Sequence, residues 1–151
     1  MDINLLSQQM NLILSVAGAE YTRSLRDNDL RGSQLPYLLA VCRLPGATQD
    51  TIAGDLGVDK SNVARQMSEL ESLGYVTRRR DENDRRRIFV EPTDRAYDSL
   101  PALVEAVSDC QRELMRGMSV EEQELLGELM TRVAKNAARL TAQRRAHGEL
   151  D

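Results

Sequence analysis

Six arginines fall within ten consecutive residues in the middle of this sequence, and their side chains are well suited to binding an anion. They form two triplets on either side of a short polar turn: Arg78, Arg79, Arg80, Arg85, Arg86 and Arg87. Guanidinium groups at this density repel one another unless an anionic partner is present. The competing interpretation is an exposed hairpin whose charges are simply solvated.

Asp84 precedes Arg86 by two residues, a spacing that places both side chains on one face if a strand has begun there. The carboxylate can then hold the guanidinium in a set direction. The minor groove of DNA is narrow and strongly negative, so an oriented arginine fits it. We therefore predict that Arg86 enters a minor groove and that the other five arginines mostly meet phosphates.

The segment 59–73 predicts an amphipathic helix with an apolar stripe of Val63, Met67, Leu70 and Leu73. The opposite face carries Ser61, Asn62, Arg65, Gln66 and Glu69. Arginine can read guanine and asparagine or glutamine can read adenine in a major groove, while serine suits a phosphate or a base edge. Lys60 and the helix N-terminus favour phosphate. The alternative is an ordinary solvated helix face.

The elements around this helix favour the DNA interpretation. A shorter helix, capped by Thr48 and ended by Gly57, comes before it, and Asp59 caps the second helix. The alternating residues around 76–78 and 88–90 then predict two strands joined by a polar turn. The expected unit is a helix-turn-helix followed by a basic hairpin.

Long amphipathic helices are expected on both sides of this unit. They cover residues 3–25, a segment capped by Ser33, a segment capped by Thr93 with Pro101 inside it, and a segment opened by a capping box of Ser119 and Glu122. Their apolar stripes exceed what a compact unit can cover, which favours a two-fold dimer. We divide the chain into an N-terminal dimerisation helix (1–32), a DNA-binding domain (33–92) and C-terminal dimerisation helices (93–151).

The sequence resembles the multiple-antibiotic-resistance-regulator (MarR) family of bacterial transcription factors. The matching segments are PGATQDTIAGDLGVDKSNVARQMSELESLGYVTRRRDENDRRR, PTDRAYDSL and MSVEEQELLGELMTRVAKN. The resemblance implies a mainly α fold with a small β-hairpin wing, a winged helix-turn-helix whose long terminal helices form a dimerisation lobe. It also implies that the helix of residues 59–73 is the recognition helix and that Asp84 and Arg86 are the wing's Asp-x-Arg pair. Pro92-Thr93 and Ala96 depart from the family's usual Leu-Thr and Gly.

Family members often lose DNA affinity when a small ligand binds between the dimerisation lobe and the winged helix. The resemblance therefore implies a small aromatic or anionic effector, with Tyr21, Arg31 and Tyr37 as candidate pocket residues. The competing interpretation of these three residues is plain packing and a surface charge.

Other classes of function find little support in the sequence. Cys42 and Cys110 lack metal-type spacing and have apolar neighbours, which disfavour a reactive thiolate, and His147 is the only histidine. We expect no cofactor, no metal site and no enzyme. The net charge is −4 and aromatic residues make up 3% without any Trp, which argues against base-stacking platforms. No apolar run approaches the ~18 residues of a membrane span, so we expect a cytoplasmic protein.

Together these patterns predict a sequence-specific regulator of transcription that binds double-stranded DNA. The resemblance implies a repressor that binds a palindromic operator as a homodimer. A small ligand would release it. The alternative is a winged-helix module used only for protein assembly. An apolar wing would be more typical of that alternative than the arginine-rich hairpin seen here.

Overall fold

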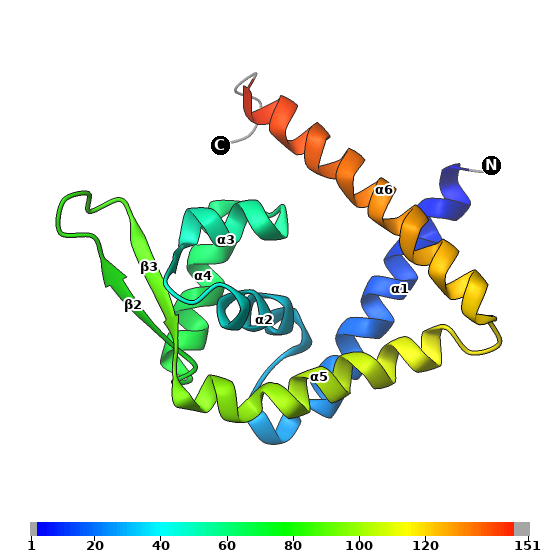
Figure 1. Ribbon diagram of the computed structural model, residues 1–151, viewed down its shortest axis with the longest axis horizontal. Helices are drawn as coiled ribbons and strands as arrows, with labels where there is room; N and C mark the ends of the chain where they lie inside the picture. The colour runs from blue at the N-terminus through cyan, green and yellow to red at the C-terminus, as the bar shows by residue number, and fades with distance from the viewer. Residues whose placement is uncertain (1–2, 147–151) are drawn as a thin grey trace. The chain divides into compact units, whose positions relative to one another are not determined.

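The computed structural model describes residues 3–146 and shows a mostly helical chain with a small antiparallel sheet (Figure 1). This confirms the predicted fold class. The elements in chain order are α1 (Ile3–Ser24), η1 (Arg26–Asn28), η2 (Gly32–Gln34), α2 (Leu35–Arg43), β1 (Ala47–Thr48), α3 (Gln49–Leu56), α4 (Lys60–Ser72), β2 (Val76–Arg80), β3 (Ile88–Pro92), α5 (Asp94–Leu114) and α6 (Val120–Ala146).

The chain forms two compact units, Met1–Gln111 and Arg112–Asp151. The first contains the sheet and the two central helices, and the second contains α6. The three-part division at residues 32 and 92 stays a prediction about roles. Among the described residues, no helix is both long enough and apolar enough to cross a membrane.

The turn between α3 and α4 forms as the sequence predicts. The Thr48 side chain accepts a hydrogen bond from the Thr51 N–H at 3.1 Å, which caps α3. Gly57 ends α3 in the left-handed region with a φ of 65°, a conformation that costs glycine little. The Asp59 carboxylate accepts from the Ser61 N–H at 2.6 Å and caps α4. Local capping therefore fixes where both helices begin.

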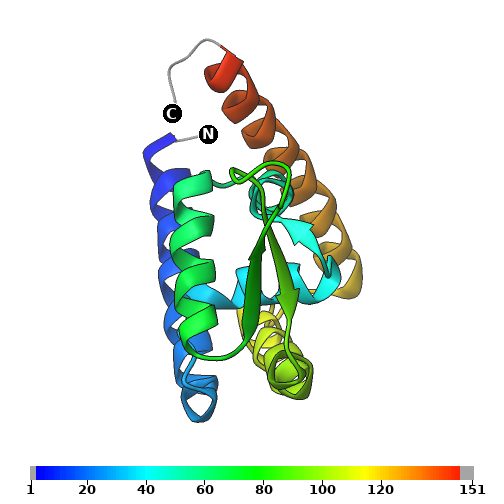
Figure 2. The same ribbon diagram turned by 90° about the vertical axis from the view of Figure 1, so that its left-hand side faces the viewer.

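The sheet has the strand order β1-β3-β2 and is antiparallel throughout. Strands β2 and β3 form the expected hairpin, which stands beside α4 (Figure 2). Strand β1 was not predicted, because two residues are too few to show an alternating pattern. It places Thr48, the cap of α3, directly opposite Phe89 in β3.

A single apolar core holds α2, α3, α4, α5 and the sheet together within the first unit. Its fully buried members include Leu38, Ile52, Met67, Val90 and Leu103. The end of α4 is also tied to its surroundings by polar contacts. The buried Tyr75 donates its hydroxyl to the Asn28 carbonyl at 2.6 Å, and Arg95 donates to the Leu73 carbonyl at 2.6 Å.

The starts of α2 and α5 can be compared with the starts predicted from the sequence. Ser33 is not the cap of α2, because it lies inside the 3₁₀ turn η2 and α2 begins at Leu35. The buried side chain of Gln34 instead accepts from the Arg31 N–H at 2.9 Å. Helix α5 begins at Asp94, next to the predicted cap Thr93, and runs through Pro101.

Helix α6, in the second unit, begins with the predicted capping box. The Ser119 N–H donates to Glu122 at 2.7 Å, and the Glu122 N–H donates back to the Ser119 hydroxyl at 3.3 Å. The backbone is helical to Ala146. Residues 147–151, with His147, lie outside the described residues.

The packing of η2 on α1 depends on Gly32. A Cβ atom there would overlap the Gly18 carbonyl oxygen, which belongs to the backbone of α1 and cannot move aside alone. We expect Gly32→Ala to lower the free energy of unfolding by about 1–3 kcal/mol, the usual cost of overpacking. The matched control is Gly54→Ala, because a Cβ in the interior of α3 meets nothing within 4 Å and should stabilise by about 0.5–1 kcal/mol. Urea denaturation measures both, and equal stability of the two variants would contradict the role of Gly32.

Candidate nucleic-acid interface

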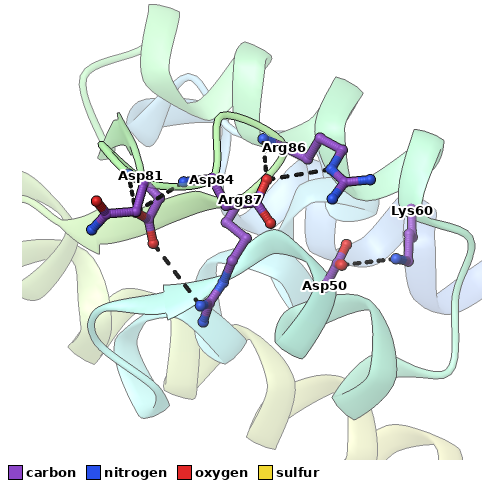
Figure 3. A network of polar contacts seen from close by, with 7 residues as sticks. Asp50, Lys60, Asp81, Asp84, Arg86 and Arg87 are labelled. Carbon is purple, nitrogen blue, oxygen red and sulfur yellow. Dashed lines mark hydrogen bonds and ion pairs between the residues drawn. The ribbon is translucent and has the colours of Figure 1, made fainter.

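The first turns of α4 expose the side chains that the sequence assigned to DNA reading. Lys60, Ser61 and Arg65 are exposed, and Asn62 is half-buried. The Arg65 guanidinium donates to the Asn62 amide oxygen at 2.9 Å, which orients it along the helix surface. Lys60 forms an exposed ion pair with Asp50 at 2.8 Å (Figure 3). An exposed pair of this kind is worth little, so Lys60 can exchange Asp50 for a phosphate.

Gln66 corrects the prediction for this helix. It is only 4% exposed, and its amide oxygen has no hydrogen-bond partner among the described residues. Both α2 and α3 pack against α4, so the buried arc is wider than the stripe of Val63, Met67 and Leu70. Gln66 is therefore part of the packed side of α4 and cannot reach a base edge.

Glu69 joins α4 to the segment before α2. Its carboxylate forms an ion pair with Arg31 and accepts a hydrogen bond from the buried Gln34 at 3.2 Å. The other carboxylate oxygen lies 3.8 Å from the Arg65 guanidinium. Glu69 thus lies on the predicted polar face but makes internal contacts that hold α4 in place.

The Asp84–Arg86 pair forms, although its backbone differs from the expectation. Both residues lie in the hairpin turn, because β2 ends at Arg80 and β3 begins only at Ile88. The Asp84 carboxylate accepts from the Arg86 backbone N–H at 3.1 Å and from its Nε at 3.3 Å (Figure 3). The Arg86 side chain is 93% exposed, so its other N–H groups face solvent in a set direction.

Asp81 organises the turn and was missed as a functional residue. Its carboxylate accepts from the backbone N–H groups of Asn83 at 2.8 Å and Asp84 at 3.3 Å. These bonds, with the nearby Arg87, lower the pKa of Asp81 from its ordinary value. An aspartate that begins a polar turn commonly bonds to the N–H two residues on, and this is the signal that could have identified it.

The arginines of β2 lie on opposite faces of the sheet because neighbouring strand residues alternate. Arg78 points to the side of α4, where its Nε and Nη2 donate to Glu71 at 2.9 and 2.6 Å. These hydrogen bonds lower the pKa of Glu71. Arg78 is therefore engaged in bracing the wing against α4, whereas the sequence had assigned it mainly to phosphate.

The other five arginines of the wing are exposed: Arg79, Arg80, Arg85, Arg86 and Arg87. The guanidinium groups of Arg79 and Arg87 lie over the Phe89 ring, at 5.1 and 5.6 Å from its centroid. The structure therefore keeps five of six arginines at the surface and gives several of them a fixed neighbour. Such a surface is electropositive and is suited to a polyanion.

Of the three candidate effector residues, Arg31 lines an open hollow. This hollow of about 570 Å³ is lined by Gly18, Ala19, Thr22, Arg23, Arg26, Arg31 and Ser33. Tyr37 is buried, and burial raises its pKa, while Arg65 and a hydrogen bond with Asn62 oppose that rise. Burial also raises the pKa of Tyr21, which lies beside Cys110.

The cysteines show no metal-binding or reactive environment. Burial raises the pKa of the Cys42 thiol, which disfavours the thiolate. Cys110 is buried. Within residues 3–146, no cluster of three potential metal ligands occurs.

The brace between Glu71 and Arg78 predicts a pH-dependent contribution to stability. The pKa of Glu71 is lowered from 4.5, so the contribution is present above about pH 4.5 and is lost as the pH falls through the folded-state pKa. We expect Glu71→Gln to be less stable than the wild type by on the order of 0.5 kcal/mol at neutral pH, since the pair is partly exposed. The difference should disappear once the pH falls below the folded-state pKa of Glu71. Urea titrations at several pH values measure the difference in stability between Glu71→Gln and the wild type, and the exposed Glu105→Gln is the control. A difference in stability that does not change with pH would contradict the brace.

Comparison with known proteins agrees with this geometry. The sequence model of the MarR family matches residues 28–87, which extend from the turn after α1 to the wing. An uncharacterized HTH-type transcriptional regulator, YybA of Bacillus subtilis, is 29% identical over 114 residues, covering 76% of this chain and 76% of YybA.

Solved structures show the same fold over nearly the whole chain. A crystal structure of MarR is 29% identical with a TM-score of 0.82, covering 95% of this chain and 98% of that one. A mutant MarR from E. coli complexed with operator DNA is 22% identical with a TM-score of 0.76, covering 87% of this chain and 95% of its own. The chain therefore has the winged helix-turn-helix fold of MarR, and its residues 28–87 match the MarR family.

Proposed function

We propose that this protein is a sequence-specific DNA-binding repressor of transcription that binds a palindromic operator as a homodimer. The observation that carries the proposal is the exposed basic wing, whose Arg86 is aimed by Asp84, beside the exposed N-terminal turns of α4. The DNA-bound MarR of the same fold supports it as an analogy. No feature of the described residues favours the protein-assembly alternative.

The proposed interface divides its contacts into two kinds. Base edges in the major groove are read by Arg65, Asn62 and Ser61, since these side chains project from the start of α4. Lys60 and the N–H groups at the start of α4 bind phosphate. Arg86 enters the minor groove next to this site. The other exposed arginines of the wing bind the backbone and set the register of the protein on the duplex.

A homodimer is supported by exposed apolar side chains on two helices. On α1 they include Leu5, Leu12, Ile13 and Leu14, and on α6 they include Leu125, Leu129, Met130, Val133 and Leu140. Apolar surface of this extent needs a partner, and a second copy supplies the same surface by two-fold symmetry. Two copies related in this way present two recognition helices, which match the two halves of a palindrome.

We also propose that a small anionic effector regulates the DNA affinity of this protein. Arg31 lines the open hollow beside α1 and also pairs with Glu69 of α4. A carboxylate that enters the hollow would compete with Glu69 for the Arg31 guanidinium. Loss of that ion pair would loosen α4 where it is tied to the segment before α2, and DNA affinity would fall.

Binding to duplex DNA across a range of salt concentrations tests the proposed function. We expect a steep fall in affinity, with log K decreasing by about 0.9 for each phosphate contact per unit of log salt concentration. Fluorescence anisotropy measures the affinity, and sedimentation of the complex should show two chains per operator duplex. Absent or salt-insensitive binding would contradict the proposal and favour a protein-assembly module.

Substitutions should separate base recognition from binding of the DNA backbone. Arg65→Ala should relax base preference in selection from random duplexes, with a smaller effect on non-specific affinity. Arg86→Ala should weaken operator binding by roughly 1–3 kcal/mol, the scale of one good readout contact. The control is Arg116→Ala, because this exposed arginine lies in the turn before α6 and pairs with Glu113. The same selected sequence for Arg65→Ala and the wild type would show that α4 is not the reader.

A further inference from the structure

The face of the wing that points away from α4 carries an unusual group of three side chains. Arg79 lies directly across from Phe89 in the β2–β3 ladder, and Arg87 comes two residues before Phe89 in the chain. Arg78 points toward Glu71 on α4, so its neighbour Arg79 must lie on the other face. Both guanidinium groups lie over the one ring, at 5.1 and 5.6 Å from its centroid.

The two guanidinium groups keep their hydrogen-bond donors available. Within the described part of the chain, Arg79 has no hydrogen-bond partner. Arg87 forms a loose ion pair with the Asp81 carboxylate at 3.9 Å, a distance too long for a hydrogen bond (Figure 3). An aromatic ring attracts a nearby cation through its electron-rich face and is not a conventional hydrogen-bond acceptor, so the guanidinium N–H groups can still donate elsewhere. Phe89 therefore fixes where these cations lie without using their donors.

Another arginine of the same unit shows the contrast. Arg95 also lies over an aromatic ring, 4.6 Å from the centroid of Tyr75. Its guanidinium nevertheless donates to the Leu73 carbonyl and lies 3.4 Å from an Asp29 carboxylate oxygen. Arg95 is thus a structural contact at the end of α4. Arg79 and Arg87 place two positive charges at one ring, and the carboxylate beside them, Asp81, lies 3.9 Å from Arg87, so an external anion would relieve the repulsion that remains.

We propose that Phe89 is a positioning residue that holds Arg79 and Arg87 together as a binding site for the phosphodiester backbone of DNA. The inference rests on the proposed function and adds a residue and a site to it. Planar guanidinium donors match phosphate oxygens in pairs, which favours a phosphodiester over a halide or an isolated carboxylate. Because backbone contacts carry no base information, this site contributes to all duplexes equally.

The test is a double-mutant cycle measured with operator and random-sequence duplexes. Phe89→Leu keeps an apolar side chain and removes the aromatic face, so it should weaken binding to both duplexes about three- to tenfold. Phe89→Tyr keeps the aromatic face and should bind as the wild type does. When Arg79→Gln and Arg87→Gln are already present, Phe89→Leu should have little further effect.

Three outcomes would overturn this inference. Unchanged binding by Phe89→Leu would show that the ring holds nothing that DNA uses. An equal loss with and without the two arginines would show that Phe89 acts through packing of the wing. The arginine variants keep the ring, so they test the site even if Phe89→Leu unfolds. An unchanged salt dependence of Arg79→Gln with Arg87→Gln would contradict the phosphate contacts, because each lost contact should reduce the slope by about 0.9.

The same data separate this inference from the proposed function. If the wild type binds no duplex, both are wrong. If the wild type binds and Arg65→Ala changes base preference while the Phe89 cycle shows no coupling, only the arginine site over Phe89 is wrong. Thermal unfolding of each variant, followed by circular dichroism, shows that the compared proteins are folded.

Discussion

Repulsion among the six arginines is the constraint that shapes the wing of this protein. A hairpin with this charge density would splay its side chains in solution if nothing held them. In the structure, four of these arginines have a neighbour that holds them: Glu71 contacts Arg78, the Phe89 ring contacts Arg79 and Arg87, and Asp84 contacts Arg86. Each neighbour takes up part of the positive charge or fixes its direction, and the face that remains is basic and ordered.

The same contacts connect the wing to α4. The Arg78 side chain reaches from β2 to Glu71 near the end of that helix, and Glu69, two residues earlier, reaches Arg31 and Gln34. Helix α4 is thus tied on one side to the wing and on another to the segment before α2, over a core that includes Met67. The turns near Arg65 are the part of α4 that stays exposed to solvent. Their orientation depends on these polar contacts, because the contacts hold the rest of the helix in place.

Local rules predicted much of the fold. Thr48, Gly57 and Asp59 act within a few residues of themselves, so capping and turn chemistry placed α3 and α4 from the sequence. Gln66 shows where such rules end, because its burial depends on how widely α2 and α3 cover α4. A helical period alone cannot give the width of a buried face. The contact of Phe89 with Arg79 was missed for a related reason, since Arg79 lies across a strand pair whose register only the structure provides.

The arrangement also suggests why the proposed reading of bases and binding of phosphate would be carried by separate residues. Contacts to the backbone are alike at every site and set the register of a protein on DNA, whereas base contacts distinguish one site from another. Arg79 and Arg87 rest on a ring that points away from α4, so a phosphate could bind them without disturbing Arg65 and Asn62. Arg78 cannot join either group without leaving Glu71. Its place between wing and helix would keep the two groups at a constant separation, and a constant separation is what recognition of a regular double helix requires.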